Sequence, residues 1–249
     1  MLHRKMWEWL FIAEALSERG LLEPGRRGLG FGVGKEPLVA LFASYGCEVL
    51  ATDQPPEQAA TSGWTDSQIE WAGGLEGLNE DGLCPPDVFE RNATYRHVDM
   101  NQIPPDLRGF DFTWSSCAFE HLGSLAAGAD FVLAQMACLR PGGIGVHTTE
   151  YTVSSNETTI DSGATVLYRR RDIEALARRL RRAGHAIDVD FTEGTTPEDL
   201  HVDTPPYTNV HLRTTLGEYV TTSLALVIEK DGEGGSLLRR ITRRRTRYS

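Results

Sequence analysis

Two pairs of a histidine and a carboxylate could act as acid, base or metal ligands. Glu120 and His121 follow one expected strand, 110–114. His147 and Glu150 lie at the end of the next, 144–147. A histidine can take a proton from a hydroxyl near neutral pH while a carboxylate orients it. Because neighbouring parallel strands end at one edge of a sheet, we expect the two pairs to meet there, as a general base or as ligands of a divalent ion.

A run of alternating glycines lies upstream and must help to position any ligand. It is followed by an expected helix, 36–45, and a strand, 48–52, that ends at Asp53. Glycine lets a ligand approach the main chain closely, and a helix N-terminus offers free N–H groups. An acid at the tip of the second strand can accept hydrogen bonds from a ribose. The stretch predicts a site for a nucleotide-like ligand. Its glycines are Gly28, Gly30, Gly32 and Gly34.

The spacing of these residues decides between nucleotide ligands. The dinucleotide fingerprint needs a third glycine where this chain has Val33 or Lys35, so a nicotinamide cofactor is disfavoured. A phosphate-binding P-loop needs a glycine where Leu29 stands and a serine or threonine where Glu36 stands. The sequence therefore excludes a P-loop.

These residues resemble the class I S-adenosylmethionine-dependent methyltransferases, whose first motif is an alternating-glycine loop and whose second strand ends in an acid. The passage from helix 126–139 through Pro141, Gly142 and Gly143 into a strand is also similar to that family. One departure is Gly28, where the family commonly has an acid. The resemblance implies S-adenosyl-L-methionine as cofactor. It also implies an α/β fold: a seven-stranded, mostly parallel, doubly wound sheet of order 3-2-1-4-5-7-6, with helices on both faces and an antiparallel last strand.

The same resemblance suggests how the cofactor is held. An acid just after the third strand, 95–98, would accept a hydrogen bond from the adenine amino group, with a methionine against the ring. Asp99 and Met100 occupy those places. The positions expected to contact the cofactor are Gly28, Gly30, Gly32, Gly34, Asp53, Gln54, Asp99, Met100 and Ser115.

The pair Glu120 and His121 looks like one found in ubiquinone-pathway O-methyltransferases and in small-RNA terminal methyltransferases, where a metal is held. Those families have a further acid three residues before the glutamate, and this chain has Cys117 there. The departure favours a metal-free base over a divalent metal. In a plainer alternative, Glu120 caps the following helix and His121 packs against the adenosine.

Length and composition fit one domain. With 249 residues, 40% of them hydrophobic, we expect a methyltransferase domain over 1–235 and a basic, disordered tail over 236–249. The N-terminal helix is expected at about 5–20, with Trp7, Phe11 and Ala15 as its apolar stripe. Insertions are expected at about 55–95, with a short helix at 66–71, and at about 151–168 and 192–215.

Charge and cysteine usage narrow the partners and the compartment. The net charge of −10 gives no general attraction to nucleic acid or anionic lipid. The stretch Asp203 to Tyr207 is similar to the Asp-Pro-Pro-Tyr motif of base-modifying methyltransferases, but it carries an extra threonine and lies far from the fourth strand. Four cysteines without a Cys-x-x-Cys pair suit a cytoplasmic protein. Glu8 and Glu14 interrupt the apolar stretch 7–15, so we expect neither a signal peptide nor a membrane span.

Together these features predict a methyltransferase acting on a polar small molecule, through O-methylation of a sugar or natural-product hydroxyl with help from a base or a metal. Two alternatives remain open. One is a non-catalytic domain that binds S-adenosylmethionine, and the other is a nicotinamide-dependent oxidoreductase. The sequence leaves the acceptor and the oligomeric state open.

Overall fold

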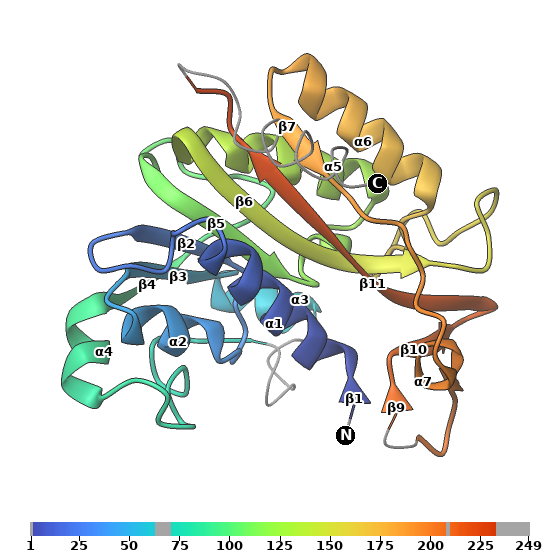
Figure 1. Ribbon diagram of the computed structural model, residues 1–249, viewed down its shortest axis with the longest axis horizontal. Coiled ribbons are helices and arrows are strands. Elements are labelled where there is room, and N and C mark those ends of the chain that lie inside the picture. The colour runs from blue at the N-terminus through green and yellow to red at the C-terminus, as the bar shows by residue number, and fades with distance from the viewer. Residues whose placement is uncertain (1, 63–70, 208–209, 233–249) are drawn as a thin grey trace, which may run out of the picture.

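The computed structural model describes residues 2–62, 71–207 and 210–232, and its core is one twisted sheet (Figure 1). The strands of this sheet are β2 (Arg27–Phe31), β3 (Glu48–Asp53), β4 (Ala93–His97), β5 (Phe110–Ser116), β6 (Leu139–Thr152), β7 (Ala186–Asp188), β8 (Val202–Asp203), β10 (Arg213–Leu216) and β11 (Tyr219–Glu229). The helices are α1 (Arg4–Ser17), α2 (Leu38–Ser44), α3 (Pro56–Ser62), α4 (Pro86–Asn92), α5 (Leu125–Ala134), α6 (Arg170–Arg182) and α7 (Pro197–Leu200). A separate two-stranded sheet joins β1 (Leu2–His3) to β9 (Val210–His211).

The strand order confirms the predicted topology. The order is β4-β3-β2-β5-β6-β11-β10-β8, and β7 also pairs with β11. The strands from β4 to β6 are parallel, whereas β11 is antiparallel to β6, β7 and β10. Numbered along the seven predicted strands, this order is 3-2-1-4-5-7-6. The short strands β8 and β10 come from the predicted insertion 192–215 and extend the sheet beyond seven strands.

Two layers of helices bury the two faces of the sheet. On one face, called the α1 face, Ile12 and Phe42 pack against Trp114 of β5. On the other, the α5 face, Phe131 and Leu176 pack in one cluster with Phe31. Figure 1 shows α1 across the front of the sheet and α5 and α6 on the opposite side. Because successive side chains of a strand point to opposite faces, a shift of one residue decides which layer a side chain enters.

The buried stripe of α1 differs from the predicted one. Trp7 is 40% exposed, and the buried side chains are instead those of Glu8, Ile12, Ala15 and Leu16. These residues recur at the spacing of one helix face, rotated by one position from the predicted stripe. The Glu8 carboxylate therefore lies on the side of α1 that faces the sheet.

Other boundaries of strands and insertions differ from the predicted ones by a few residues. Strand β6 runs from Leu139 to Thr152 and so enters the predicted insertion 151–168. Most of the predicted helix 66–71, and the whole tail 236–249, lie outside the described residues. Helix α6 buries one apolar stripe, formed by Ile173, Leu176, Ala177 and Leu180. Within the described ranges, no helix is both long enough and apolar enough to cross a membrane.

Candidate active site

The glycine loop lies where the carboxyl ends of three parallel strands meet. Gly32 and Gly34 have φ values of 58° and 50°, in the left-handed region that favours glycine. A Cβ atom on Gly32 would lie 2.9 Å from Ala118 Cβ and 3.3 Å from Met100 Sδ. The ends of β2, β4 and β5 therefore approach one another around Gly32. In open α/β sheets this edge is where ligands bind.

Gly28 and Gly30 make room for aromatic side chains of the core, whereas Gly32 lies at the ends of the strands. A Cβ atom on Gly28 would lie 2.4 Å from the ring of Phe112, and one on Gly30 would lie 2.4 Å from the ring of Trp114. The two residues pair in register with these aromatic residues of β5. Their missing side chains make room for core packing on the α1 face. This corrects the expectation that all four glycines serve the ligand.

Asp53 joins the glycine loop to the following insertion. Its Oδ2 accepts hydrogen bonds from the amides of Gly34, at 3.1 Å, and Ala72, at 3.0 Å, while Oδ1 accepts one from the amide of Gln54, at 2.8 Å. The side chain is buried, and burial raises the pKa of Asp53 to about 6. The carboxylate is thus held at the tip of β3, beside Gly34.

The other expected cofactor positions lie around the same edge. Asp99 Oδ1 accepts a hydrogen bond from the Asn101 amide at 2.8 Å, and Oδ2 accepts one from Gln58 Nε2 at 3.1 Å. The indole of Trp71 donates to the carbonyl oxygen of Gln54 at 3.1 Å. These contacts fix the segments that follow β3 and β4 beside the glycine loop.

His147 and Ser115 point into the core of the α5 face. Their Nδ1 and Oγ atoms are 2.8 Å apart, and the imidazole makes a T-shaped contact with the ring of Phe131. His147 is completely buried, and burial lowers its pKa to about 3. So weak a base is ill suited to take a proton near neutral pH. The prediction that His147 converges with Glu150 is wrong, because the two side chains leave β6 on opposite faces.

Glu120 and His121 separate after strand β5. Glu120 is fully buried, where it accepts hydrogen bonds from Thr149 Oγ1 at 3.2 Å and from the Glu150 amide at 3.3 Å. Burial raises its pKa. His121 instead directs Nδ1 to the carbonyl oxygen of Ala164, at 2.9 Å. The structure brings Glu120 beside Glu150 but leaves His121 at the neighbouring loop.

The alternative role of Glu120 as a helix cap is not what the structure shows. The cap of α5 is Ser124, whose hydroxyl accepts a hydrogen bond from the amide of Ala127 at 3.1 Å. Capping by a serine satisfies one of the free N–H groups at the start of the helix. Glu120 is therefore available to the polar cluster at the ends of β5 and β6.

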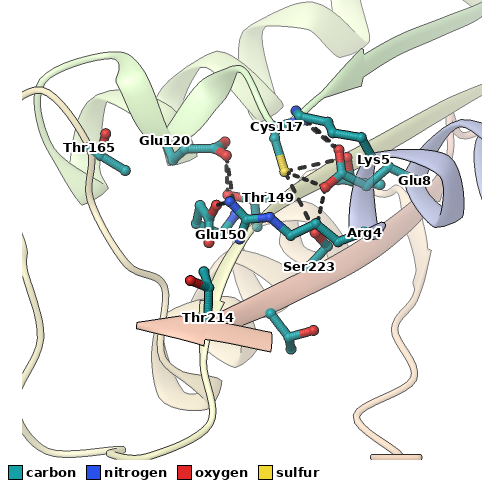
Figure 2. Close-up of polar contacts among 12 residues, drawn as sticks. Arg4, Lys5, Glu8, Cys117, Glu120, Thr149, Glu150, Thr165, Thr214 and Ser223 are labelled. Atoms are coloured by element: carbon teal, nitrogen blue, oxygen red, sulfur yellow. Dashed lines mark hydrogen bonds and ion pairs between the residues drawn. The ribbon is translucent and has the colours of Figure 1, made fainter. Parts of the chain in front are cut away.

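The start of α1 adds charged residues to this cluster. Glu8 is fully buried and accepts hydrogen bonds from Ser116 Oγ at 2.9 Å, from Cys117 Sγ at 3.1 Å and from Ser223 Oγ. Lys5 Nζ lies 3.3 Å from the Glu8 carboxylate. Burial alone would raise the pKa of Glu8, but the Lys5 charge and the three donors together hold it below its usual value. Figure 2 shows this carboxylate directed at Cys117 and Ser223.

Arg4 forms a second ion pair across the same cluster. Its Nη2 atom contacts Glu150 Oε1, and Figure 2 shows the side chain reaching from α1 to β6. Three buried atoms nearby have no hydrogen-bond partner among the described residues: Arg4 Nη1, Glu150 Oε2 and Thr221 Oγ1. Buried polar atoms are rarely left without a partner. The Arg4–Glu150 pair therefore retains hydrogen-bonding capacity that the described residues do not use.

Cys117 sits at the turn that follows β5. Its φ of 46° is in the left-handed region, which is uncommon for a residue with a side chain. Such strain is found often at functional sites. Burial raises the pKa of the Cys117 thiol well above its usual value, so the group is a neutral donor to Glu8.

Arg4, Lys5 and Glu8 were not among the predicted site residues, although one sequence pattern indicates Glu8. Glu8 lies at helical spacing from Ile12 and Ala15, and a carboxylate on an apolar stripe needs a buried partner. Nothing in the local sequence marks Arg4, because its partner Glu150 comes from a distant strand, whereas Lys5 lies one helical turn before Glu8.

The stretch Asp203 to Tyr207, which is similar to a base-modifying motif, begins on β8 near the N-terminal segment. Asp203 is fully buried on β8, with Oδ2 2.7 Å from His211 Nδ1. The His211 ring stacks on that of His3, with centroids 4.8 Å apart. His3 directly precedes Arg4, and β1 pairs with β9. Asp203 and His211 thus help to hold the N-terminal segment against the end of the sheet.

A surface hollow lies apart from the glycine loop. This hollow of about 370 Å³ lies between α6 and β7, lined among others by Arg178, Asp188 and Phe191, and it shares no residue with the glycine loop. In the parts of the chain that the structure describes, no three His, Cys, Asp or Glu side chains are grouped so as to hold a metal ion.

Comparison with known proteins gives similarity in structure only. No protein-family model and no curated protein sequence matches the chain. Among solved structures, the cyclase SpnF is 16% identical over 89% of this chain and 81% of its own, with a TM-score of 0.57. The methyltransferase domain of bacterial CtHen1-CN is 12% identical over 89% of this chain and 96% of its own, with a TM-score of 0.54.

A third structure is magnesium protoporphyrin IX methyltransferase (ChlM) from Synechocystis PCC 6803 with bound SAH. It is 11% identical over 90% of this chain and 82% of its own, with a TM-score of 0.53. The chain has the fold of the class I S-adenosylmethionine-dependent methyltransferases.

Proposed function

We propose that this protein binds S-adenosylmethionine beside the glycine loop and transfers its methyl group to an oxygen atom of a polar small molecule. The observation that carries the proposal is the meeting of Gly32, Asp53 and Met100 at the carboxyl ends of β2, β3 and β4. ChlM, which shares the fold, was crystallised with SAH. The bound cofactor would supply an electrophilic methyl group.

The residues around Gly32 fit such a cofactor. Gly32 has no side chain where the ends of three strands approach one another. The Asp53 carboxylate would accept the hydrogens of ribose hydroxyl groups, and Gln54 follows it directly. Asp99 would accept a hydrogen from the adenine amino group, and Met100, 8% exposed, would lie against the ring.

On the acceptor side, Glu150 and Glu120 remain candidates to orient and deprotonate a hydroxyl group. Glu150 Oε2 is buried without a partner among the described residues, and Glu120 binds the Glu150 main chain. His121 stays a candidate at the neighbouring loop, while His147 is withdrawn because it lies in the opposite layer. A hydroxyl of a sugar or another natural product is the proposed acceptor.

A titration and a screen test this function together. Isothermal titration calorimetry with S-adenosylmethionine and S-adenosylhomocysteine should show binding of both. A screen of hydroxyl compounds with methyl-labelled S-adenosylmethionine, run with and without chelator, should show transfer of label. Absence of binding would contradict the proposal. Binding without transfer to any acceptor would instead indicate a non-catalytic domain.

Replacement of Asp53 by alanine should weaken binding of S-adenosylmethionine. Loss of charge-assisted hydrogen bonds of this kind costs about 1.5–3 kcal/mol, or about 10- to 150-fold in Kd. Titration calorimetry measures the change, and thermal unfolding shows whether the variant remains folded. Asp106→Ala is the matched control, since Asp106 is exposed and pairs with Arg96. An Asp53→Ala protein with unchanged affinity would remove Asp53 from the site.

The pKa of Asp53 predicts a pH dependence of cofactor binding. Its carboxyl is ionised above a pKa of about 6 in the folded protein, and only the ionised form accepts two hydroxyl hydrogens. Affinity for S-adenosylhomocysteine should therefore rise about tenfold between pH 5 and pH 7 and then level off. The Asp53→Asn variant should lack this rise. A rise of equal size in that variant would assign it to another group.

We also propose a cytoplasmic location. The four cysteines are free thiols, and all four side chains are buried. Unpaired cysteines suit a reducing compartment. Fractionation of cells that express the protein tests this proposal.

A further inference from the structure

Three buried polar atoms without a partner gather at one place on the α1 face. They are Arg4 Nη1, Glu150 Oε2 and Thr221 Oγ1, and each is unpaired among the described residues. An unpaired buried polar atom destabilises a folded protein, so three together indicate a group that is bound during function.

Strand register brings the three atoms together. In the antiparallel pair β6–β11, Glu150 lies opposite Ser223, and Thr221 is two residues along the same strand from Ser223. Residues two apart on a strand share a face, so Glu150 and Thr221 are diagonal neighbours. Arg4 reaches the same face through its ion pair with Glu150. Figure 2 shows Thr214 of β10 beside this cluster, and Thr214 pairs in register with Thr221.

The charges of the cluster balance within the protein. Arg4 pairs with Glu150, and Lys5 pairs with Glu8. Burial raises the pKa of Glu120, and its carboxyl group already accepts hydrogen bonds from Thr149 Oγ1 and the Glu150 amide. A charged ligand at this place would have no counter-charge, and burying an unpaired charge is strongly unfavourable. The cluster is therefore suited to a neutral group.

The unpaired atoms also specify the hydrogen bonds of that group. Arg4 Nη1 can only donate, and Glu150 Oε2 as a carboxylate oxygen can only accept. A hydroxyl does both, so one hydroxyl can accept from Arg4 and donate to Glu150. The Thr221 hydroxyl, a diagonal neighbour, can then bond a second hydroxyl of the same molecule.

We propose that Arg4, Glu150 and Thr221 form the acceptor site and that the acceptor is an uncharged compound with two neighbouring hydroxyl groups. This inference rests on the proposed function and names its acceptor class. Glu150 Oε2 accepts the hydrogen of the reacting hydroxyl, and Arg4 and Thr221 fix its orientation.

The first test compares two buried threonines. Thr221→Val removes a hydroxyl without a partner, while Thr113→Val removes one that donates to Gln135 Oε1 at 2.7 Å and is equally buried. Thermal unfolding of the free protein should show an unchanged or raised Tm for Thr221→Val and a lowered Tm for Thr113→Val. A similar loss in both variants would show that the Thr221 hydroxyl already has a partner in the free protein, and it would overturn the inference.

The second test varies the charge of the acceptor on two fixed skeletons. One series is catechol, 3,4-dihydroxybenzoate and dopamine, and the other is methyl glucoside, glucuronate and glucosamine, each with labelled S-adenosylmethionine. The neutral members should have the highest kcat/KM, and Thr221→Val should reduce it about tenfold. A preference for a charged member overturns the inference, as does transfer to no member by protein that binds S-adenosylmethionine. Loss of that binding contradicts the proposed function instead.

Discussion

Glu8→Ala is expected to lower the free energy of unfolding by about 3–4 kcal/mol. The carboxylate is fully buried and is the shared acceptor for Ser116, Cys117 and Ser223, as well as the partner of Lys5. Its removal leaves these donors without an acceptor, and each unsatisfied buried donor costs about 1–3 kcal/mol. Lys5 is 37% exposed and keeps contact with water, so most of the loss comes from the other donors. Urea unfolding at pH 7 measures the change.

Glu14→Ala is the matched control on the same helix. Glu14 is exposed, and such a substitution changes stability by no more than about 0.5 kcal/mol. If the two variants unfold at the same urea concentration, the Glu8 network does not hold α1 to the sheet. The expected difference would show that α1 is fixed by polar contacts to β5 and β11 at the place where the acceptor is proposed to bind.

The fold, and the grouping of strand-end residues at one edge of the sheet, follow from local patterns. The alternating glycines, the acid that ends β3 and the Asp99–Met100 step are spaced along the chain in the order in which their strands lie in the sheet. Parallel strands all end at one edge, so residues at strand ends can be placed together without knowledge of side-chain contacts. This is why the sequence could place Gly32, Asp53 and Met100 at one edge of the sheet, while their role in binding the cofactor stays a prediction.

The acceptor side depends on information that local patterns lack. Whether the side chain of His147 or that of Glu150 enters the α1 face depends on the register of β6, and a shift of one residue reverses the answer. Arg4 is distant in sequence from Glu150, and the donors Ser116, Cys117 and Ser223 are distant from Glu8. No spacing rule links these partners. Gly28 shows a related difficulty, since packing against Phe112 and close approach of a ligand require the same residue type.

Replacement of Glu36 by glutamine is expected to stabilise the protein by about 3 kcal/mol at pH 7. Glu36 is buried and accepts a hydrogen bond from Trp114 Nε1 at 2.6 Å. Burial raises its pKa to about 8, from an ordinary value of 4.5. The folded protein therefore binds this proton more tightly than the unfolded chain, and stability falls as pH rises from 4.5 to 8. At about 1.4 kcal/mol per pH unit, the loss reaches about 3 kcal/mol by pH 7.

The glutamine variant keeps an oxygen that accepts from Trp114 but has no proton to lose. The difference in unfolding free energy between the two proteins should therefore be small near pH 4, grow up to pH 8 and then stay constant. Glu48→Gln, at an exposed position on β3, should show no such growth. A difference that does not vary with pH would mean that Glu36 is ionised in the folded protein. A neutral Glu36 matters for the site because it adds no second negative charge beside Asp53, whose own ionisation the ribose contact requires.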